Sequence, residues 1–421
     1  MPTTFHPGPL RGEIAVPGDK SISHRALIIA TKSSTPVAIS NLNPGRDVAA
    51  TRAALEALGA HIDVDGAVVN VSSARLRDPS APLDCENSGS TARMLMGVCS
   101  GANLRATFIG DDSLSGRPME PAAAQLRAFG ATIETRDGRL PLTLRGTASP
   151  QTRDFILLSP SAQIKSALLF AGLFGETAIT ISGDRGSRDH TERLLADFGA
   201  AIAFDGRTVR YEPGPLGCDA LRMPGDFSAA AFFLVAATIA PGSALVIRDV
   251  GVNPARTGLL DVLLSMGARI EQRNERAWGS EPVADLYVES SELRGTAVGP
   301  QTAQRAIDEI LVLAVAAARA SGATRVSGVR ALRDKESDRL AGIERILSRV
   351  DVKVEALPNG IVIHGGPGGS GSGTVATAGD HRTAMAVAAL ATAAGPLSID
   401  DGASIAVSFP DFLATLQKAQ R

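Results

Sequence analysis

The stretch ALEALGAHIDVDG, residues 54–66, joins a helical pattern to a strand pattern at a single glycine. Apolar residues recur at helical spacing before Gly59 and alternate with polar residues after it. Glycine at such a point is typical of a helix C-terminus, because the backbone there turns into a conformation that glycine adopts easily. The stretch therefore predicts an amphipathic helix, then an alternating strand and a turn.

The same pattern returns with a period of roughly 70 residues. Three close copies, one weaker copy and a last helix without a following strand are predicted: QLRAFGATIETRDG from residue 125, LLADFGAAIAFDG from 194, VLLSMGARIEQRN from 262, ILSRVDVKVEALPNG from 346 and FLATLQKAQR from 412. One supersecondary unit, repeated six times, accounts for this pattern.

Each unit also contains an earlier and more apolar helix that follows a polar loop. The six segments are PGDKSISHRALIIA from residue 17, NSGSTARMLMG from 87, SPSAQIKSALLFAG from 159, PGDFSAAAFFLVAA from 224, AIDEILVLAVAAA from 306 and GDHRTAMAVAALA from 379. The first and fourth share Pro-Gly-Asp-x-Ser, so the chain divides into two halves of three units, and the second half begins near Pro224.

The two kinds of helix predict an α/β fold with a layered arrangement. The Ala- and Leu-rich helices are expected to form a buried centre in each half, and the amphipathic helices an outer layer. If the buried helices of one half run parallel, their N-termini open on the same face. Two such faces opposed to each other would suit a ligand with more than one negative group.

Composition limits the classes of function. The 421 residues are 44% hydrophobic, 20% charged and 4% aromatic, which is typical of a globular protein with more than one aliphatic core. A formal net charge of −2 excludes a broad positive field for nucleic acid or anionic lipid. The apolar run at 229–240 is too short for a bilayer and predicts a buried helix, and MPTTFHPGPLRGEIAV at the start lacks an apolar signal core.

Three cysteines, Cys85, Cys99 and Cys218, have neither the spacing of a disulfide framework nor that of a zinc site. Their pattern favours a reducing cytoplasm.

The first polar loop, VPGDKSISHR at residues 16–25, is close to a phosphate-binding P-loop. That motif needs glycine immediately before the lysine and five residues earlier, where this chain has Asp19 and Ile14. The nucleotide interpretation therefore fails. Lys20, Ser21 and Arg25 remain candidates for holding an anion, and the alternative is a capped helix with charges on its wet face.

The other loops carry similar residue types, and each loop alone has an ordinary explanation as a turn, a helix cap or a helical ion pair. The candidates in them are Gly89, Arg117, Ser161, Gln163, Lys165, Arg188, Asp308, Glu309, Lys335, Glu336, Arg339, Asp380, His381 and Arg382. Basic residues recur at helix starts, where the helix dipole disfavours them unless an anion is bound. This recurrence predicts a polyanionic ligand.

Seven motifs together resemble the 5-enolpyruvylshikimate-3-phosphate synthase family of enolpyruvyl transferases. They are PGDKSISHRA, NSGSTAR, GDDSLSGRPM, SAQIKSALL, SRDHTER, KESDRL and GDHR, in the family's order over nearly the whole chain. The resemblance implies a two-domain inside-out α/β barrel in which each domain has three βαβαββ repeats around buried parallel helices. It implies one domain at 20–224, a second formed by 1–19 and 225–421, and an active site in the cleft between them.

The implied activity is transfer of the enolpyruvyl group of phosphoenolpyruvate to the 5-hydroxyl of shikimate 3-phosphate, with release of phosphate by addition and elimination. This reaction belongs to the shikimate pathway, which leads to chorismate and the aromatic amino acids, and is the target of glyphosate. The resemblance also implies a cytoplasmic monomer with these two small molecules as its partners, no nucleic acid, no membrane, and no metal or organic cofactor.

The resemblance assigns roles residue by residue. Ligands of shikimate 3-phosphate are Lys20, Ser21, Arg25, Ser161, Gln163, Arg188, Asp308 and Lys335. Ligands of phosphoenolpyruvate are Lys20, Gly89, Arg117, Gln163, Arg339 and Arg382. Asp308 is expected to be the base, Glu336 the acid, and Lys20 a further catalytic group that balances charge.

Four residues depart from the pattern of some members: Ala162, Leu311, Thr383 and Val407. Val407 stands where some members have a lysine, so one additional phosphoenolpyruvate contact is in doubt.

Two alternatives stay open at this point. A UDP-N-acetylglucosamine enolpyruvyl transferase has the same architecture, but most members carry a reactive cysteine in the loop that matches GDDSLSGRPM, and this loop has none. A non-catalytic anion-binding relative is expected to have lost one of the two acids, whereas Asp308 and Glu336 are both present.

Overall fold

The computed structural model describes residues 2–73, 75–366 and 369–421, and the chain forms two compact units. Unit 2 comprises Gly18–Met223 and the short segment Ala277–Glu281. Unit 1 comprises the residues up to Pro17, then Pro224–Arg276 and Pro282–Arg421. Both units mix helices with parallel and antiparallel strands, which confirms the predicted α/β class.

The strands of unit 2 form three sheets of four strands in the described chain, in the orders β14-β3-β5-β4, β6-β7-β9-β8 and β10-β11-β13-β12. Their bounds are β3 (Val37–Ser40), β4 (His61–Asp65), β5 (Val68–Ser72), β6 (Leu83–Asp84), β7 (Arg105–Ile109), β8 (Thr132–Arg136), β9 (Arg139–Arg145), β10 (Asp154–Ile156), β11 (Ile179–Ser182), β12 (Ala201–Phe204), β13 (Val209–Glu212) and β14 (Ala220–Arg222). Each sheet has one parallel pair, followed by two antiparallel pairings.

Unit 1 repeats this plan in two sheets of the described chain, β16-β17-β15-β2 and β18-β19-β21-β20, and has a third sheet β1-β23-β22. The bounds are β1 (Thr3–Phe5), β2 (Arg11–Ala15), β15 (Ala244–Gly251), β16 (Arg269–Trp278), β17 (Glu281–Glu289), β18 (Ala297–Val298), β19 (Gly322–Ser327), β20 (Lys353–Leu357), β21 (Gly360–Gly365), β22 (Gly373–Val375) and β23 (Leu397–Ile399). Strands β1 and β2, from the start of the chain, pair with β23 and β15.

The repeated glycine ends the outer helix in four of the repeats. Gly59, Gly130, Gly199 and Gly267 all have positive φ, between +79° and +122°. In the fifth, weaker copy Asp351 takes this position with φ of +53°. The repeat predicted from residues 54–66 is therefore a repeat of backbone conformation as well as of sequence.

The helices fall into the two predicted layers. The central helices are α1 (Lys20–Ala30), α3 (Gly89–Gly101) and α6 (Ala162–Phe174) in unit 2, and α8 (Phe227–Ile239), α11 (Ile310–Ala318) and α13 (His381–Ala394) in unit 1. The longer outer helices are α2 (Arg46–Ala57), α5 (Glu120–Phe129), α7 (His190–Asp197), α9 (Gly258–Ser265), α12 (Arg339–Leu347) and α14 (Phe412–Ala419). The shorter helices are α4 (Asp112–Ser115), α10 (Pro300–Arg305) and three 3-10 turns at Arg330–Asp334, Ser348–Val350 and Ala403–Val407.

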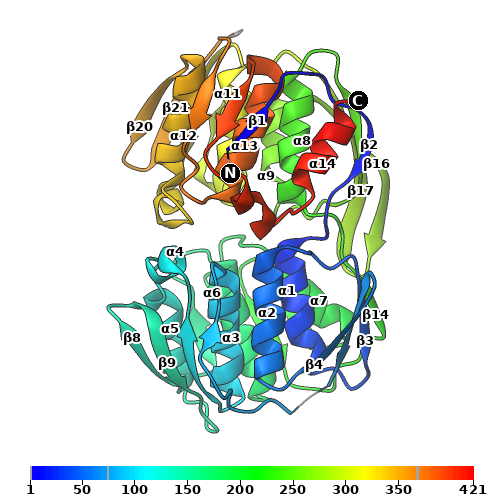
Figure 1. The fold of residues 1–421 in the computed structure, drawn as a ribbon. Helices are drawn as coiled ribbons and strands as arrows, with labels where there is room; N and C mark the ends of the chain where they lie inside the picture. The colour runs from blue at the N-terminus through cyan, green and yellow to red at the C-terminus, as the bar shows by residue number, and fades with distance from the viewer. Residues whose placement is uncertain (1, 74, 367–368) are drawn as a thin grey trace. The chain divides into compact units, whose positions relative to one another are not determined.

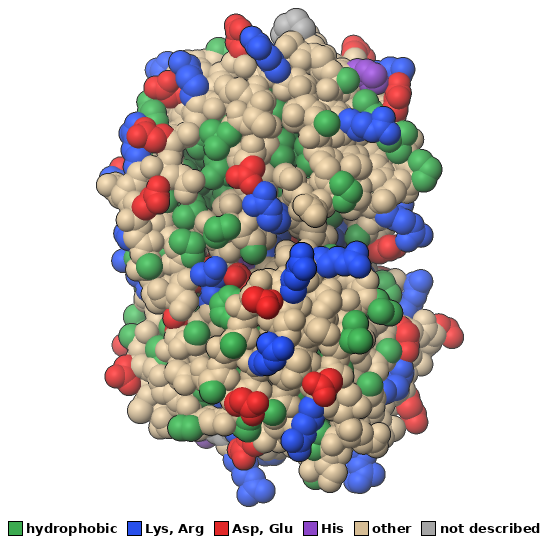
Figure 2. All heavy atoms as spheres, turned by 180° about the vertical axis from the view of Figure 1, so that it is seen from behind, with side chains coloured by type: hydrophobic (Ala, Val, Ile, Leu, Met, Phe, Trp, Pro, Cys, Tyr) green, Lys and Arg blue, Asp and Glu red, His purple; other side chains and the backbone are tan. Residues whose placement is uncertain are grey.

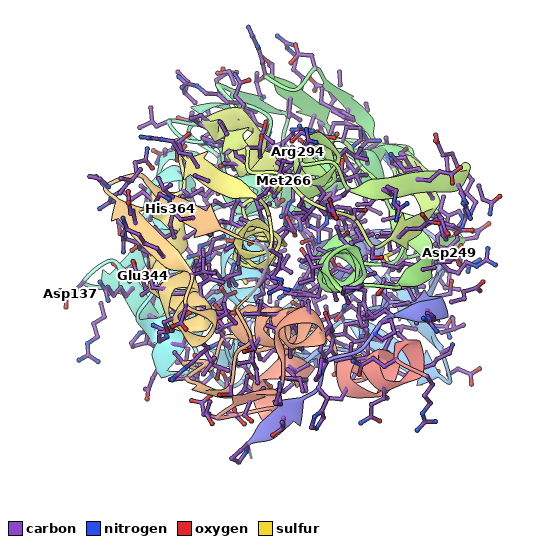
Figure 3. All side chains as sticks on the ribbon, turned by 90° about the horizontal axis from the view of Figure 1, so that it is seen from above. Asp137, Asp249, Met266, Arg294, Glu344 and His364 are labelled. Carbon is purple, nitrogen blue, oxygen red and sulfur yellow. The ribbon has the colours of Figure 1, made fainter. Side chains whose placement is uncertain are left out.

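Burial confirms the central helices. Every residue of α8 and of α11 is buried, and α8 contains the apolar run that was predicted to be a buried helix. In the view from above, α8, α11 and α13 of unit 1 are seen nearly end-on, inside the strands, with His364 labelled at the rim (Figure 3). The helix α14 confirms the last predicted helix.

Helices α3 and α6 of unit 2 pack closely side by side (Figure 1). A Cβ added at Gly97 would lie 2.1 Å from the carbonyl oxygen of Ala167, and one at Gly101 would lie 2.1 Å from that of Ala171. The two glycines therefore let the helix backbones meet. This contact holds α6 directly against α3, and both helices carry predicted site residues at their starts.

Charged side chains of both signs are intermixed on the face shown in Figure 2. This agrees with the small formal net charge of −2. Among the described residues, no helix has both the length and the apolar character needed to cross a membrane.

Candidate functional site

Each unit gathers its own share of the predicted site residues. Unit 2 holds Lys20, Ser21, Arg25, Gly89, Arg117, Ser161, Gln163 and Arg188, and unit 1 holds Asp308, Lys335, Glu336, Arg339 and Arg382.

The start of α1 presents Lys20 with an acidic neighbour. Asp19 caps the helix, because its carboxylate accepts a hydrogen bond from the backbone N–H of Ile22 at 2.9 Å. Lys20 Nζ lies 2.6 Å from a carboxylate oxygen of Asp47 on α2. Both side chains of this pair are about nine-tenths buried, at 13% and 10% exposure. The pair with Asp47 therefore fixes the Lys20 ammonium at the N-terminus of α1.

Arg25 lies one turn further along α1 and is 3% exposed. Its guanidinium donates to the hydroxyl oxygens of Thr191 at 2.7 Å and Ser166 at 2.9 Å, and to the backbone carbonyl of Ser21 at 2.7 Å. The predicted ligands Ser21 and Arg25 are thus joined directly. Helices α6 and α7 supply the other two contacts.

Gly89, Gln163 and a further arginine meet where α3 and α6 begin. Arg93 Nη1 donates to the side-chain carbonyl of Gln163 at 2.9 Å and to the backbone carbonyl of Gly89 at 3.3 Å. Gln163 in turn donates to the hydroxyl of Ser90 at 2.9 Å. The amide of Gln163 is therefore oriented by two partners from α3.

Arg117 follows the short helix α4 and is 8% exposed. Its Nη2 donates to the side-chain oxygen of Asn87 and, at 3.1 Å, to the hydroxyl of Ser113. A Cβ built on Gly89 would lie 3.5 Å from Arg117 Nη1, so Arg117 belongs to the same group as Gly89.

Ser161 caps α6, with its hydroxyl accepting from the backbone N–H of Ile164 at 3.3 Å. Arg188 lies in the loop before α7, next to Ser187, whose backbone N–H donates to Asp184 at 3.1 Å. The structure therefore places Ser161 and Arg188 in separate segments, both of which are attached to the start of α6.

The start of α11 is the centre of the group in unit 1. Asp308 Oδ1 lies 3.4 Å from Lys335 Nζ and 3.3 Å from Arg339 Nη1. Glu336 also pairs with Arg339, at 2.6 Å. The two predicted acids are therefore bound by one guanidinium.

Arg339 is 1% exposed, and its Nε lies 2.9 Å from a carboxylate oxygen of Asp380, which is fully buried. Burial alone would lower the pKa of Arg339, but the carboxylates of Asp380, Glu336 and Asp308 outweigh it and raise the pKa above its usual value. For Asp380, burial acts to raise the pKa, whereas Arg339 lowers it, and the net shift is downward. The pair is ionised at neutral pH.

Arg382 is the second residue of α13 and is 8% exposed. It donates to the backbone carbonyl of Asp308 at 3.0 Å and lies 3.7 Å from Glu309 Oε1. Glu309 also accepts from the hydroxyl of Ser228 at the start of α8. The N-terminal turns of α8, α11 and α13 are thereby linked by one polar network.

The helix-dipole argument from the sequence needs correction. Lys20, Arg339 and Arg382 do stand in the first turns of their helices, where the dipole disfavours positive charge. However, Lys20 pairs with Asp47 and Arg339 with Asp380, so the chain itself offsets this cost. A bound anion is therefore not required to explain these positions.

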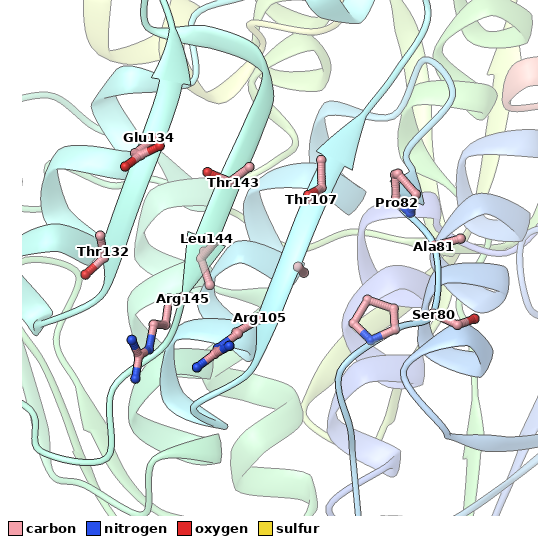
Figure 4. A pocket seen from close by; sticks show the side chains of 12 residues that line it. Ser80, Ala81, Pro82, Arg105, Thr107, Thr132, Glu134, Thr143, Leu144 and Arg145 are labelled. Atoms are coloured by element: carbon pink, nitrogen blue, oxygen red, sulfur yellow. The ribbon is translucent and has the colours of Figure 1, made fainter.

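A groove of about 480 Å³ lies away from both groups, on the face of the sheet formed by β7, β8 and β9 (Figure 4). Its lining includes Arg105 and Arg145, which stand opposite each other on β7 and β9. None of the predicted site residues lines it. In the described ranges, no group of three or more His, Cys, Asp or Glu side chains has the arrangement of a metal site.

Several residues of the two groups were not predicted to act there. Asp47, Arg93, Ser166 and Thr191 each bind a predicted ligand directly. Arg93 lies inside the motif NSGSTAR, so its place among polar residues at the start of α3 was a usable signal. Ser166 and Thr191 also lie inside quoted motifs, SAQIKSALL and SRDHTER, but their role as partners of Arg25 follows only from the contacts in the structure.

Comparison with known proteins gives a consistent result. The family model described as EPSP synthase (3-phosphoshikimate 1-carboxyvinyltransferase) matches residues 5–416. A 3-phosphoshikimate 1-carboxyvinyltransferase from Afipia carboxidovorans is 46% identical over 422 residues, which cover 97% of this chain and 95% of that protein. A protein of the same name from an Anaeromyxobacter species is 44% identical and covers 97% and 96%.

Solved structures agree. The EPSP synthase of Acinetobacter baumannii superposes with a TM-score of 0.86 at 34% identity, and covers 100% of this chain and 98% of its own. The enolpyruvyl transferase NikO of Streptomyces tendae has a TM-score of 0.78 at 18% identity, covering 99% and 97%, which shows a shared fold.

Proposed function

The chain belongs to the EPSP synthase family, and on that basis we propose that the residue groups of units 1 and 2 act together as one site. The chain transfers the enolpyruvyl group of phosphoenolpyruvate to shikimate 3-phosphate, in the shikimate pathway that leads to the aromatic amino acids. The alternative acceptor, a UDP-sugar, is not favoured by these relatives.

Shikimate 3-phosphate is bound, in this proposal, by cations and hydroxyls that come from both units. The ligands are Lys20, Ser21, Arg25, Ser161, Gln163, Arg188, Asp308 and Lys335. Charge-assisted hydrogen bonds from Lys and Arg suit a phosphate and a carboxylate, and Ser hydroxyls and the Gln amide suit the sugar-like hydroxyls.

Phosphoenolpyruvate carries a carboxylate and a phosphate, and therefore needs several cations. The proposed ligands are Lys20, Gly89, Arg117, Gln163, Arg339 and Arg382. Arg117 and Arg382 are each 8% exposed, so their charges act where water screens them weakly. As phosphate leaves, these groups balance the charge that develops on it.

The two acids divide the proton transfers. Asp308 takes the proton of the 5-hydroxyl as this oxygen attacks the enol carbon, and Glu336 protonates the methylene carbon, which gives a tetrahedral adduct. Expulsion of phosphate, with loss of a proton from the new methyl group, then restores the enol ether. Because Arg339 contacts both carboxyl groups, it fixes the spacing between base and acid.

The shared guanidinium is the observation that supports this assignment most directly. Asp308 and Glu336 lie 3.3 Å and 2.6 Å from Nη1 and Nη2 of Arg339, so the two acids occupy one small volume. The test is phosphate release from phosphoenolpyruvate with either shikimate 3-phosphate or the UDP-sugar as acceptor. Release with only the UDP-sugar would overturn the proposal.

The proposal includes a monomer in the cytoplasm. Sedimentation over a range of concentrations tests the oligomeric state, and fractionation of the source cells tests the compartment.

A further inference from the structure

We propose that Lys165 is a positioning residue for shikimate 3-phosphate binding. Its ammonium fixes the positions of Arg25 and Arg188 through the segments that carry or contact these two arginines. The inference rests on the proposed function, since it concerns the same ligand. It uses contacts within unit 2 only.

Lys165 lies in the first turn of α6 and is 1% exposed. Its Nζ lies 2.7 Å from Asp184 Oδ2 and 2.6 Å from Glu192 Oε1, and it donates to the backbone carbonyl of Ser187 at 3.4 Å. One ammonium thus joins α6, the loop before α7 and α7 itself.

The contacts with the loop before α7 fix the backbone immediately before Arg188. Asp184 accepts from the backbone N–H of Ser187 at 3.1 Å and from its hydroxyl at 3.0 Å. Lys165 binds the other side of the same serine through its carbonyl. Ser187 is therefore fixed at its N–H, its hydroxyl and its C=O, and Arg188 follows it directly.

The contacts with α7 determine the geometry of Arg25. Lys165 and Ser166 are neighbours on α6, and Glu192 and Thr191 are neighbours on α7. Lys165 and Glu192 form the ion pair, and the hydroxyls of Ser166 and Thr191 share a hydrogen bond of 2.7 Å. Ser166 and Thr191 are also the hydroxyl partners of Arg25, so the ion pair aligns the two oxygens that orient this guanidinium.

The charge state supports the same role. Burial acts to lower the pKa of Lys165, but Glu192 and Asp184 outweigh it and raise the pKa, so the side chain is an ammonium. A neutral side chain of similar volume would leave two carboxyl groups buried together without a cation, and the link that joins them through the ammonium would be lost. Arg188 and Thr191 would then move with the segment that carries them.

The hydrogen bonds that orient Gln163, a proposed ligand of both substrates, come from α3 and not from Lys165. Arg93 and Ser90 of α3 orient Gln163, and the contacts at Gly97 and Gly101 fix α6 against α3. Loss of the Lys165 contacts should therefore weaken the binding of shikimate 3-phosphate more than the binding of phosphoenolpyruvate.

The experiment compares Lys165→Met, Lys165→Arg and Glu192→Gln with the wild-type chain. Calorimetry gives Kd for shikimate 3-phosphate, and steady-state kinetics give kcat and KM for phosphoenolpyruvate. We expect Lys165→Met to raise Kd for shikimate 3-phosphate about tenfold or more, with KM for phosphoenolpyruvate within about twofold, as for loss of one hydrogen bond to a charged group. Lys165→Arg should recover most of the affinity.

The control is Val71→Ala, which removes core volume at a fully buried position of β5, in the sheet β14-β3-β5-β4. It should lower the unfolding midpoint and leave both ligand constants unchanged. If Lys165→Met does not fold, Glu192→Gln decides, with an expected rise in Kd of about threefold from the loss of one charge.

Equal weakening of both ligands, or unchanged Kd with a lowered unfolding midpoint, would overturn the role of Lys165. A wild-type chain that does not bind shikimate 3-phosphate would instead overturn the proposed function. The two failures are therefore distinguishable.

Discussion

Arg93 Nη1 lies 2.9 Å from Gln163 Oε1, and this hydrogen bond joins the first turn of α3 to the first turn of α6. A Cβ built on Gly89 would lie 2.6 Å from the same nitrogen. A side chain at position 89 must therefore displace the guanidinium that orients Gln163. Residues 89 and 163 are coupled, although they do not bind each other directly.

We expect Gly89→Ala to make the enzyme less sensitive to glyphosate. Glyphosate is longer than phosphoenolpyruvate, so the added methyl group and the displaced Arg93 should obstruct the inhibitor more than the substrate. Overpacking of this kind costs about 1–3 kcal/mol, or roughly ten- to a hundredfold in affinity. The measurement is the inhibition constant for glyphosate together with KM for phosphoenolpyruvate, which should rise less.

A matched control is Gly116→Ala at the end of α4. Its φ of −76° suits any residue, and a Cβ there would lie no closer than 3.4 Å to other atoms. It should leave both constants unchanged. Equal weakening of the two ligands by Gly89→Ala would contradict the argument from length, and a wild-type enzyme indifferent to glyphosate would mean that other residues, such as Met94 or Ala162, reshape the pocket.

Removing either acid should lower turnover far more than binding. We expect Asp308→Asn and Glu336→Gln each to reduce kcat by about 100-fold or more, the usual range for a general acid or base. The fold should be retained, because Arg339 keeps Asp380 and the remaining acid as partners. Glu344→Gln on the exposed side of α12 is the control, and near-normal kcat in either variant at saturating substrates would show its assigned role to be wrong.

Binding of shikimate 3-phosphate should draw the two units together, because its proposed ligands come from both. Lys20 and Gln163 belong to unit 2, and Asp308 and Lys335 to unit 1. We expect a smaller radius of gyration in small-angle scattering when the ligand is added, and no change with inorganic sulfate as a control. An unchanged radius would argue against a ligand shared between the units.

Folding stability should fall below pH 7 through His24. This side chain is fully buried on α1, and burial, with Lys20 and Arg25 nearby, holds its pKa well below the ordinary value of 6.5. The folded state therefore keeps His24 neutral, whereas the unfolded chain takes up a proton as the pH falls through about 6.5. Stability from this group is complete above that pH and is lost on acidification toward the lower, folded-state pKa.

The size of this effect follows from one proton. Between pH 7.5 and 5.5, the free energy of unfolding of the wild-type chain should fall about 1.4 kcal/mol more than that of His24→Gln. Denaturant titrations at both pH values measure the difference. His61→Gln, at an exposed position on β4, is the control, and parallel pH dependence of wild type and His24→Gln would refute the prediction.

The sequence predicted the fold well because the fold is periodic. A glycine with positive φ at the end of four of the outer helices, and six apolar helices with polar starts, are local properties that sequence records directly. The segment Ala277–Glu281, which belongs to unit 2 although its neighbours belong to unit 1, was not foreseen. Its anchors, such as the buried contact of 2.7 Å between His190 and Glu281, depend on residues far apart in the chain.

The residues of the candidate site were also predictable only in part. Residues at helix starts were identifiable because polar side chains beside an apolar helix stand out in a pattern. Thr191, Ser166 and Lys165 were less visible as parts of the ligand site, because each acts through a second side chain. The carboxylate partners Asp47 and Asp380 were also needed to explain why cations at helix N-termini are tolerated.

The pairing of β1 with β23 has a consequence for the order of events on the ribosome. Thr3–Phe5 is synthesised long before its partner Leu397–Ile399, and the whole of Gly18–Met223 lies between them in the chain. Strand β1 of unit 1 therefore cannot pair with β23 while Gly18–Met223 is made, and unit 2 can begin to fold during that time. Unit 2 still lacks Ala277–Glu281 at that stage, so neither unit is complete when the other begins, and the two halves of this chain mature as an interleaved pair.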